Sequence, residues 1–423
     1  MSEPTGPRGV SPFAALQHRN FRLLWTGQLV SMAGSMMQSA AILWHVSLLV
    51  PESQRGLALG MVGLVRVLPI IGFSLLGGLA ADALDRRRVM LVTQAGMALA
   101  ASALALLTFQ GVTALWPIYL LAALGSAFGS FDGPARQSLI PNLVPREHLP
   151  NAITLNTIMF QTASVLGPAL GGLVIAGWGV AWAYAINAIS FLFVIAALLL
   201  MRDAPARAAG ARGEISLAAL REGLRFVFRA PLIRSTMLLD FFATFFASAT
   251  ALLPIFAQDI LHVGAQGYGL LSAAPSVGAM LAGLALVPLA ERIDHRGRTL
   301  LWAVAGFGLA TIAFGVAKDF AMAFACLALT GATDTVSMVI RNVIRQMHTP
   351  DALRGRMTSV NMIFFMGGPQ LGELEAGLVA HGFGAVVSVV TGGIGCLVAT
   401  GWVAARTPEL RAYRREAPGV FRP

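Results

Sequence analysis

The chain has 423 residues, of which 56% are hydrophobic and 12% are charged, and its mean hydropathy is +0.72. A soluble domain carries about 25% charged residues, so the composition excludes a soluble globular protein and indicates an integral membrane protein. The formal net charge of +10 predicts no nucleic-acid partner, because the cytoplasmic loops of membrane proteins are enriched in Lys and Arg. Both cysteines, Cys326 and Cys396, lie inside apolar runs, so we expect no disulfide, no metal site and no cofactor.

The apolar residues fall in runs of helical length rather than in ten-residue alternations, which favours helices over a β-barrel. They predict an all-α membrane protein with twelve transmembrane helices. The polar N-terminal segment predicts no cleavable signal peptide. The expected spans are 22–50, 57–82, 88–110, 113–140, 152–177, 179–201, 232–258, 266–290, 299–317, 320–344, 356–381 and 383–405.

Basic residues gather in the even-numbered loops and at the termini, whereas the odd-numbered loops carry only Arg55 and Lys318. The positive-inside rule therefore places both termini in the cytoplasm and the protein in a plasma membrane, which is the inner membrane in a Gram-negative cell. The expected order is a cytoplasmic N-terminal segment, a six-helix bundle, a cytoplasmic linker, a second six-helix bundle and a tail, at 1–21, 22–201, 202–231, 232–405 and 406–423.

A charged motif joins the second and third spans across a turn too short to hold a domain. It consists of a glycine, an aspartate and a basic run, at Gly78, Asp82, Arg86 and Arg87. The segment resembles the cytoplasmic loop motif of the major facilitator superfamily, a large family of secondary transporters, with Ala83 and Asp85 in place of its usual basic residue and glycine. The resemblance implies a conformational latch, in which Asp82 and Arg86 pair with a neighbouring helix in only one state. Arginines that only hold the loop inside the cell are the alternative.

The polar stretch between spans six and seven begins as an Ala/Arg/Gly-rich linker and continues with a helical pattern. Apolar residues recur at 217, 220, 224 and 228, and arginines occupy another face at 221, 225 and 229. This pattern predicts an amphipathic helix at the inner membrane interface. A simple connector between the two bundles is equally compatible with it.

Span five carries a segment rich in glycine and proline that includes Gly167, Pro168, Gly171 and Gly172. Small residues permit close approach of helices, and proline removes a backbone hydrogen bond and bends the helix. The segment resembles the fifth-helix motif of exporters in the same superfamily, with Ala163 in place of the preferred glycine. The resemblance implies export rather than import, and a simple packing face is the alternative.

An internal repeat relates the two halves of the chain with a constant offset of 205 residues. Two six-helix halves in the same orientation predict a two-fold axis along the membrane normal and a central path between the bundles, an arrangement that supports alternating access. The aligned pairs include Arg136 with Arg341, Pro145 with Pro350, Asn156 with Asn361, Gly172 with Gly377, Gly177 with Gly382 and Gly179 with Gly384.

Further segments narrow the resemblance to the branch that holds enterobactin-type siderophore exporters and macrolide-type efflux proteins. They are Arg19-Asn20-Phe21-Arg22-Leu23-Leu24-Trp25, Gly133-Pro134-Ala135-Arg136, Pro141-Asn142-Leu143-Val144-Pro145 and Asn151-Ala152. The fourth-helix arginine motif of proton-coupled drug exporters is not evident, since span four has leucines and alanines at 120–124. The resemblance therefore indicates a branch rather than a substrate or a coupling mechanism.

Ionisable residues inside the spans are costly in lipid and are therefore candidates for a function. Asp132 and Arg136 are expected to pair along one face of span four, and a structural charge cluster near the inner ends is the alternative to a transport site. Arg66 lies in the outer half of span two, where it can snorkel to the outer surface. The other candidates are Asp240, Asp334 and Arg341.

Span eleven carries two carboxylates, Glu373 and Glu375, where the repeat has Pro168 and Leu170 in the first half. Residues two apart point about 200° apart on a regular helix, so at most one of the two faces the central path. That residue is a candidate carrier of a coupling proton. Solvation at the outer mouth of the path is the alternative.

These patterns predict a secondary active transporter rather than an enzyme, because no nucleophile–base pair, phosphate loop or metal cluster stands out. We expect a monomer in contact with membrane lipids that exports amphipathic small molecules in exchange for protons. A lipid or lysolipid flippase and a transporter-like sensor without transport are the alternatives. Aromatic residues expected along the path, or else in packing, are Trp25, Phe160, Phe241, Phe245, Phe364 and Phe365.

Overall fold

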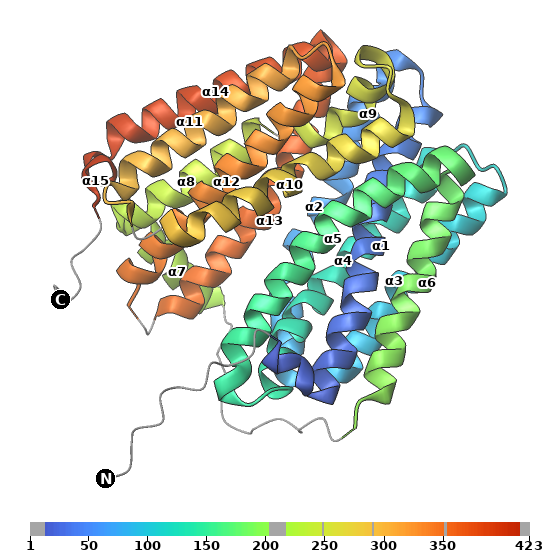
Figure 1. Ribbon diagram of the computed structural model, residues 1–423, viewed down its shortest axis with the longest axis horizontal. Coiled ribbons are helices and arrows are strands. Elements are labelled where there is room, and N and C mark those ends of the chain that lie inside the picture. Colours follow the sequence, from blue (N-terminus) through green and yellow to red (C-terminus); the bar gives the residue numbers. More distant parts are fainter. Residues whose placement is uncertain (1–12, 203–216, 248, 290–291, 351–352, 415–423) are drawn as a thin grey trace.

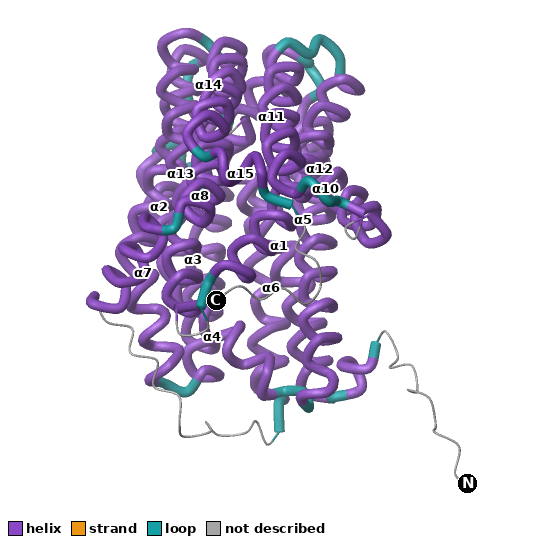
Figure 2. The backbone as a smooth tube through the Cα atoms, turned by 90° about the vertical axis from the view of Figure 1, so that its left-hand side faces the viewer, coloured by secondary structure: helices purple, strands orange, loops and turns teal. Residues whose placement is uncertain are grey.

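The structure, a computed structural model, describes residues 13–202, 217–247, 249–289, 292–350 and 353–414. The side chains at 74–83, 217–221, 223, 354–356, 358–359, 362–363 and 366 are not part of that description. For Gly78 and Asp82 of the loop motif and for Arg221, the structure therefore describes only the backbone. The described chain is helical throughout, with short loops between the helices (Figure 2).

The first bundle contains six long helices that run up and down. They are α1 (Arg19–Leu49), α2 (Glu52–Ala83), α3 (Arg86–Phe109), α4 (Leu115–Leu139), α5 (Leu149–Trp178) and α6 (Val180–Leu200). Short 3₁₀ turns precede α1 and α5, namely η1 (Ala14–Gln17), η2 (Ile140–Asn142) and η3 (Arg146–His148). Within the bundle α1 packs on α5 and α6, α2 on α4, and α3 on α4 and α6.

The second bundle repeats this plan with one interruption. Its long helices are α8 (Pro231–Phe246), α10 (Gly264–Leu289), α11 (Arg296–Gly315), α12 (Phe320–His348), α13 (Arg354–Phe383) and α14 (Ala385–Arg406), and the short α15 (Pro408–Ala412) follows. The span expected at 232–258 is found as one candidate crossing, Pro231–Ile260, but it is not one continuous helix. Here α8 is followed by η4 (Ala249–Leu252), α9 (Leu253–Ile255) and the π-helical turn η5 (Phe256–Ile260). The chain leaves helical geometry at Ala247, with φ −105° and ψ 35°, and Pro254 has no backbone N–H to continue a helix.

The expected fold class is confirmed by the two helical bundles. Of the described helices, nine are long and apolar enough to cross a membrane by length and composition. α1, α4 and α13 complete the bundles but are not among those nine. They carry several of the buried polar side chains, including Gln28, Asp132 and Glu373.

The turn that leads into the last long helix of each bundle has an unusual backbone geometry. Gly179 joins α5 to α6 with φ 91° and ψ 168°, and Gly384 joins α13 to α14 with φ 89° and ψ 157°. Positive φ favours glycine, because a Cβ is strained there. The repeat offset that aligns these two glycines in the sequence therefore also aligns two equal turns in the structure.

The two bundles converge at one end and diverge toward the other (Figure 1). We call the end that holds the α1–α2 and α5–α6 connections and α9 the outer end, after the orientation that the basic residues predict. The inner end holds the α2–α3 and α4–α5 connections and α7 (Leu217–Arg229). The hydrogen bonds and the ion pair that join one bundle to the other, described below, lie near the outer end.

The amphipathic segment forms α7 over the expected residues, Leu217–Arg229. Its apolar face packs on α8 and α13, where Val227 is 2% exposed and contacts Met357 and Val360. Arg225 lies on the exposed side of the helix. Of the apolar positions in the predicted pattern, Leu224 packs against this cluster and Phe228 is 51% exposed. The second bundle therefore covers only part of the apolar face of the helix.

Candidate functional site

Two helix crossings bring the bundles together at the outer end, α5 with α10 and α2 with α13. A Cβ added to Gly172 would lie 2.8 Å from the Cα of Gly269, and one added to Gly377 would lie 2.5 Å from the Cα of Gly60. These distances are too short for any side chain, so glycine lets the two backbones touch. Because Gly172 and Gly377 are repeat partners, the two crossings between the bundles are made by the same kind of glycine contact.

The Gly-Pro segment of α5 serves two interfaces. Gly167 faces α1, where an added Cβ would lie 2.6 Å from the carbonyl oxygen of Ala33. The carbonyl oxygen of Pro168 faces α10, at 2.6 Å from a Cβ added to Gly269. The segment therefore fixes α1 within its own bundle and meets the opposite bundle on its other side.

Polar contacts of Arg55 and His381 also join segments at the outer end, and we call this set of contacts the polar clasp. The Arg55 guanidinium donates to both carboxylate oxygens of Asp259 at 2.6 and 2.7 Å, and its Nε donates to the carbonyl of Ser47 at 3.1 Å. The ring of His381 is 2.8 Å from the carbonyl oxygen of Ser53. Arg55 is unusual in the sequence, because it is a basic residue in an odd-numbered loop. No local pattern identifies Asp259 as its partner.

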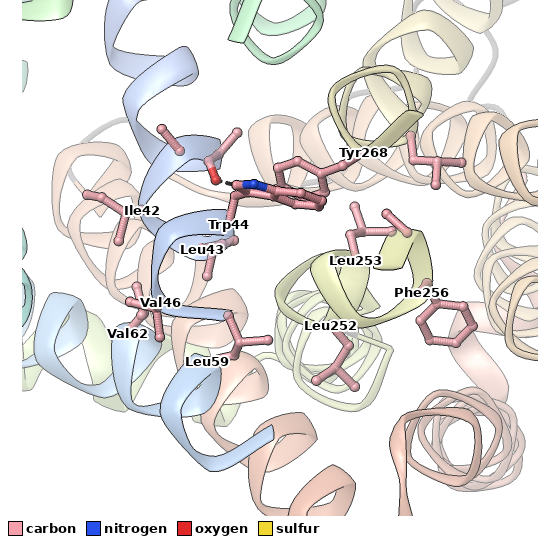
Figure 3. Close-up of a cluster of buried hydrophobic side chains, with 14 of the residues drawn as sticks. Ile42, Leu43, Trp44, Val46, Leu59, Val62, Leu252, Leu253, Phe256 and Tyr268 are labelled. Carbon is pink, nitrogen blue, oxygen red and sulfur yellow. Dashed lines mark hydrogen bonds between the residues drawn. The ribbon is translucent and has the colours of Figure 1, made fainter. Parts of the chain in front are cut away.

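An apolar cluster from both bundles lies beneath this clasp (Figure 3). Trp44 of α1 faces Tyr268 of α10 with their ring centroids 5.1 Å apart, and the Tyr268 hydroxyl donates to the carbonyl of Ala40 at 2.8 Å. The broken segment η4–η5 contributes Leu252, Leu253 and Phe256 to the same cluster. Tyr268 connects the two halves by both a ring contact and a hydrogen bond, and no local sequence pattern indicates this role.

Glu373 lies inside the α2–α13 crossing and is 8% exposed. A Cβ added to Gly63 of α2 would lie 2.7 Å from the Glu373 Cβ, and the Glu373 Oε2 has no hydrogen-bond partner among the residues that the structure describes. Arg66, one turn beyond Gly63, interacts electrostatically with Glu373 and with the buried Tyr268. Arg66 is half-buried, and its expected snorkelling to the outer surface stays a prediction. Glu375 is only half-buried, so the two carboxylates have the different surroundings that their spacing implies.

A buried charge cluster in the second bundle joins three of the expected candidates. Arg341 of α12 is 1% exposed, and its Nη2 lies 2.9 Å from Asp240 of α8 and 3.3 Å from Asp334 of α12. The Asp334 side chain is 43% exposed and lines a pocket of about 170 Å³. Threonines and aromatic residues share this lining, among them Thr244, Thr311, Thr330, Phe307 and Phe314. The cluster therefore links a buried ion pair to a pocket of mixed character.

The corresponding residues of the first bundle do not form the ion pair expected between Asp132 and Arg136. Asp132 accepts hydrogen bonds from Thr93 at 3.1 Å and from Gln94 at 2.9 Å, both on α3. The Arg136 guanidinium donates to Gln28 of α1 at 3.2 Å. Neighbouring helices supply neutral partners to both residues, so the pairing along one helix face is wrong.

The loop motif holds the inner end of the first bundle together. Asp85 caps α3 by accepting from the backbone N–H of Arg87 at 2.9 Å, which explains a carboxylate where the superfamily usually has glycine. Arg86 donates to the carbonyl of Ser138 at 3.0 Å and Arg87 to that of Leu199 at 3.3 Å. Both acceptors are carbonyls at helix C-terminal ends, which favour positive charge. The described contacts of these arginines thus stay within one bundle.

The aromatic candidates divide into different environments. Trp25 donates its indole N–H to the carbonyl of Leu155 at 3.0 Å, so it fastens α1 to α5. Phe241 stacks on Phe245 at 5.5 Å and meets Phe364 edge-on at 5.9 Å. Phe160 and Phe365 are 46% and 50% exposed.

The family match and the relatives reported next identify the chain as a membrane transporter of the major facilitator superfamily rather than an enzyme. The chain belongs to the family described as transmembrane secretion effector, which it matches over residues 10–417. Similar curated proteins are the enterobactin exporters EntS of Escherichia coli O1:K1 / APEC, 27% identical over 404 residues, and of Citrobacter koseri, 26% identical over 402 residues. In both comparisons the match covers 95% of each chain.

Solved structures with the same fold are more distant in sequence. A bacterial homologue of the human lysosomal transporter Spinster, in an inward-facing and unoccupied conformation, is 16% identical with a TM-score of 0.71, over 95% of this chain and 99% of that one. A transporter of the POT family in complex with 5-aminolevulinic acid is 11% identical with a TM-score of 0.72, over 93% and 96% of the two chains. These likenesses establish the fold alone.

We expect Gly172→Ala to open the outer end. Its added Cβ would lie 2.6 Å from the carbonyl oxygen of Ala265, and a backbone contact of this kind is relieved only when α5 and α10 separate. The reporter is disulfide formation between cysteines introduced at Ser53 and His381, which adjoin each other across the bundles. Gly177→Ala on the same helix is the control, because its Cβ would meet nothing within 4 Å. Equal cross-linking in both variants would contradict a sealing role for Gly172.

We expect Asp240→Ala to destabilise the protein by about 3–5 kcal/mol, because it leaves the buried Arg341 without its nearest partner. Asp334→Ala should cost less, since that carboxylate is 43% exposed. Thermal unfolding of the purified single variants and of Asp240→Ala combined with Arg341→Met measures the coupling between the pair. The double variant should lose less than the sum of the single losses. Strictly additive losses would show that the ion pair is not energetically coupled.

Proposed function

We propose that the chain is a proton-coupled exporter of amphipathic small molecules and works by alternating access. Membership of the transmembrane secretion effector family and the similarity to proteins named enterobactin exporters support export. The observation that carries the coupling is the position of Glu373, which is buried where two helices of opposite bundles cross. The proposal includes a monomer in the plasma membrane with both termini in the cytoplasm.

Alternating access needs a seal that opens at small energetic cost. The outer seal consists of glycine contacts between backbones, one apolar cluster and a few polar bonds. Its ion pair, Arg55–Asp259, is partly exposed, and exposed pairs contribute about 0–1 kcal/mol. Such a seal is consistent with a two-state equilibrium that a proton or a substrate can bias.

A proton on Glu373 would favour the closed outer end. An ionised carboxylate is costly to bury without hydrogen bonds to its oxygens. The Glu373 Oε2 has none from the described part of the chain, and the charge of Arg66 offsets only part of that cost. When α2 and α13 separate at the outer end, water from outside can reach the residue and protonate it. The protonated form can then enter the closed crossing, release its proton toward the inner end and complete an exchange of a proton for substrate.

The pocket lined by Asp334 supports an amphipathic substrate. It combines a carboxylate and threonine side chains with the rings of Phe307 and Phe314. Its volume of about 170 Å³ is below the roughly 300 Å³ of a typical complete ligand site. We therefore propose that it holds one group of a larger molecule, of the siderophore or macrolide type, rather than the whole.

Outward transport predicts a defined behaviour of inside-out membrane vesicles. When their interior is acidified, the vesicles should accumulate an exported siderophore, macrolide or dye, and the pH gradient should fall as they do so. Accumulation that is insensitive to a protonophore and to the imposed gradient would contradict proton coupling while leaving export intact. Loss of accumulation without this chain in the membrane is the control for other carriers.

Glu373→Gln should abolish pH-driven transport while preserving substrate exchange at zero gradient. Glutamine approximates the protonated carboxyl group, so folding and the closed crossing should be retained. Glu375→Gln is the matched control two residues away on the half-buried side of the same helix, and it should transport uphill like the parent. If Glu373→Gln also transports uphill, another acidic residue carries the proton, with Asp240, Asp132 and Asp334 next to test.

A further inference from the structure

A groove runs along the outside of the second bundle, between α11 and α14, and the short α15 closes its inner end. Figure 1 shows these helices side by side on the face of the second bundle that lies away from the first. The groove has a volume of about 580 Å³, within the range of small-molecule sites. We propose that it binds an anionic phospholipid of the surrounding membrane.

The groove is basic at its inner end and apolar beyond it, which matches the charged headgroup and the acyl chains of such a lipid. Arg298 of α11 and Arg411 of α15 both line it and both are exposed. Neither has a carboxylate within 4.0 Å in the part of the chain that the structure describes. Guanidinium groups bind the oxygens of a phosphodiester with charge-assisted hydrogen bonds, and basic pockets between membrane helices are suited to anionic headgroups.

The wall becomes apolar away from the two arginines. Trp302, 76% exposed, lies four residues after Arg298 on the same face of α11, and Ala305 follows three residues later. Residues 298 and 305 are about 10 Å apart along a helix, which is less than the roughly 15 Å hydrocarbon depth of one leaflet. A headgroup beside the arginines would therefore direct its acyl chains along the apolar part of the groove.

Small residues of α14 leave the space for those chains. Gly401 and Ala404 line the groove opposite α11. A Cβ added to Gly401 would meet nothing within 4 Å, so this glycine is not needed for helix packing. The space beside it is open to the groove.

The position of Arg411 is fixed by the packing of α15. Leu410 is fully buried, and the backbone N–H of Gly297 donates to the carbonyl of Tyr413 at 3.1 Å. A Cβ added to Gly297 would overlap the carbonyl oxygen of Leu410. These contacts hold α15 against the start of α11, and they keep Arg411 at the same end of the groove as Arg298.

The test compares lipid binding to the purified full chain, measured by native mass spectrometry, for phosphatidylglycerol and for phosphatidylcholine with the same acyl chains. The parent should retain phosphatidylglycerol preferentially, and Arg298→Gln with Arg411→Gln should weaken that binding about tenfold or more. The matched control is Arg146→Gln with Arg202→Gln, which removes the same charge from exposed positions at the inner end of the first bundle. It should leave the preference unchanged, and an equal loss in both double variants would overturn a specific site.

A second pair of measurements tests the acyl-chain part of the groove. Gly401→Leu keeps both arginines but fills the open space, so it should also displace phosphatidylglycerol. Inorganic phosphate at matched concentration should not compete, because it has no acyl chains. Full binding in Gly401→Leu, or complete displacement by phosphate, would mean that the groove does not hold a lipid.

Discussion

Contact between bare backbones at the outer end is the constraint on which the rest of this structure depends. In lipid, apolar side chains gain little by meeting one another, so helices associate through close packing of small residues and through polar bonds. Gly172 against Gly269 and Gly377 against Gly60 provide that packing. The polar clasp and the position of Glu373 both follow, because they need α2 and α13 to lie this close.

The two halves use equivalent positions for different chemistry. The repeat aligns Pro168 with Glu373, so a bend in the first bundle corresponds to a buried carboxylate in the second. It also aligns Arg136 with Arg341, of which the first binds neutral Gln28 and the second binds Asp240. The second bundle therefore contains most of the buried charged groups that protonation or a charged substrate would affect. The first bundle supplies the helix surface that packs against Glu373.

Patterns along single helices predicted much of this architecture. Composition and run lengths predicted the fold class, the period of residues 217–229 predicted α7, and the spacing of Glu373 and Glu375 predicted their unequal surroundings. Contacts between distant segments were not predictable, since nothing near Arg55 indicates Asp259. The pairing of Asp132 with Arg136 failed for the same reason, because α1 and α3 offer partners that one helix face cannot reveal.

The most direct test of the account is the distance between the bundles at the outer end as a function of pH. Spin labels on cysteines at Thr113 and Phe383, which lie in different bundles at that end, would report it in lipid bilayers. The account predicts that alkaline pH lengthens this distance in the parent, because an ionised Glu373 disfavours the closed crossing. Glu373→Gln should keep the short distance at both acidic and alkaline pH. An identical pH response in parent and variant would contradict the central claim.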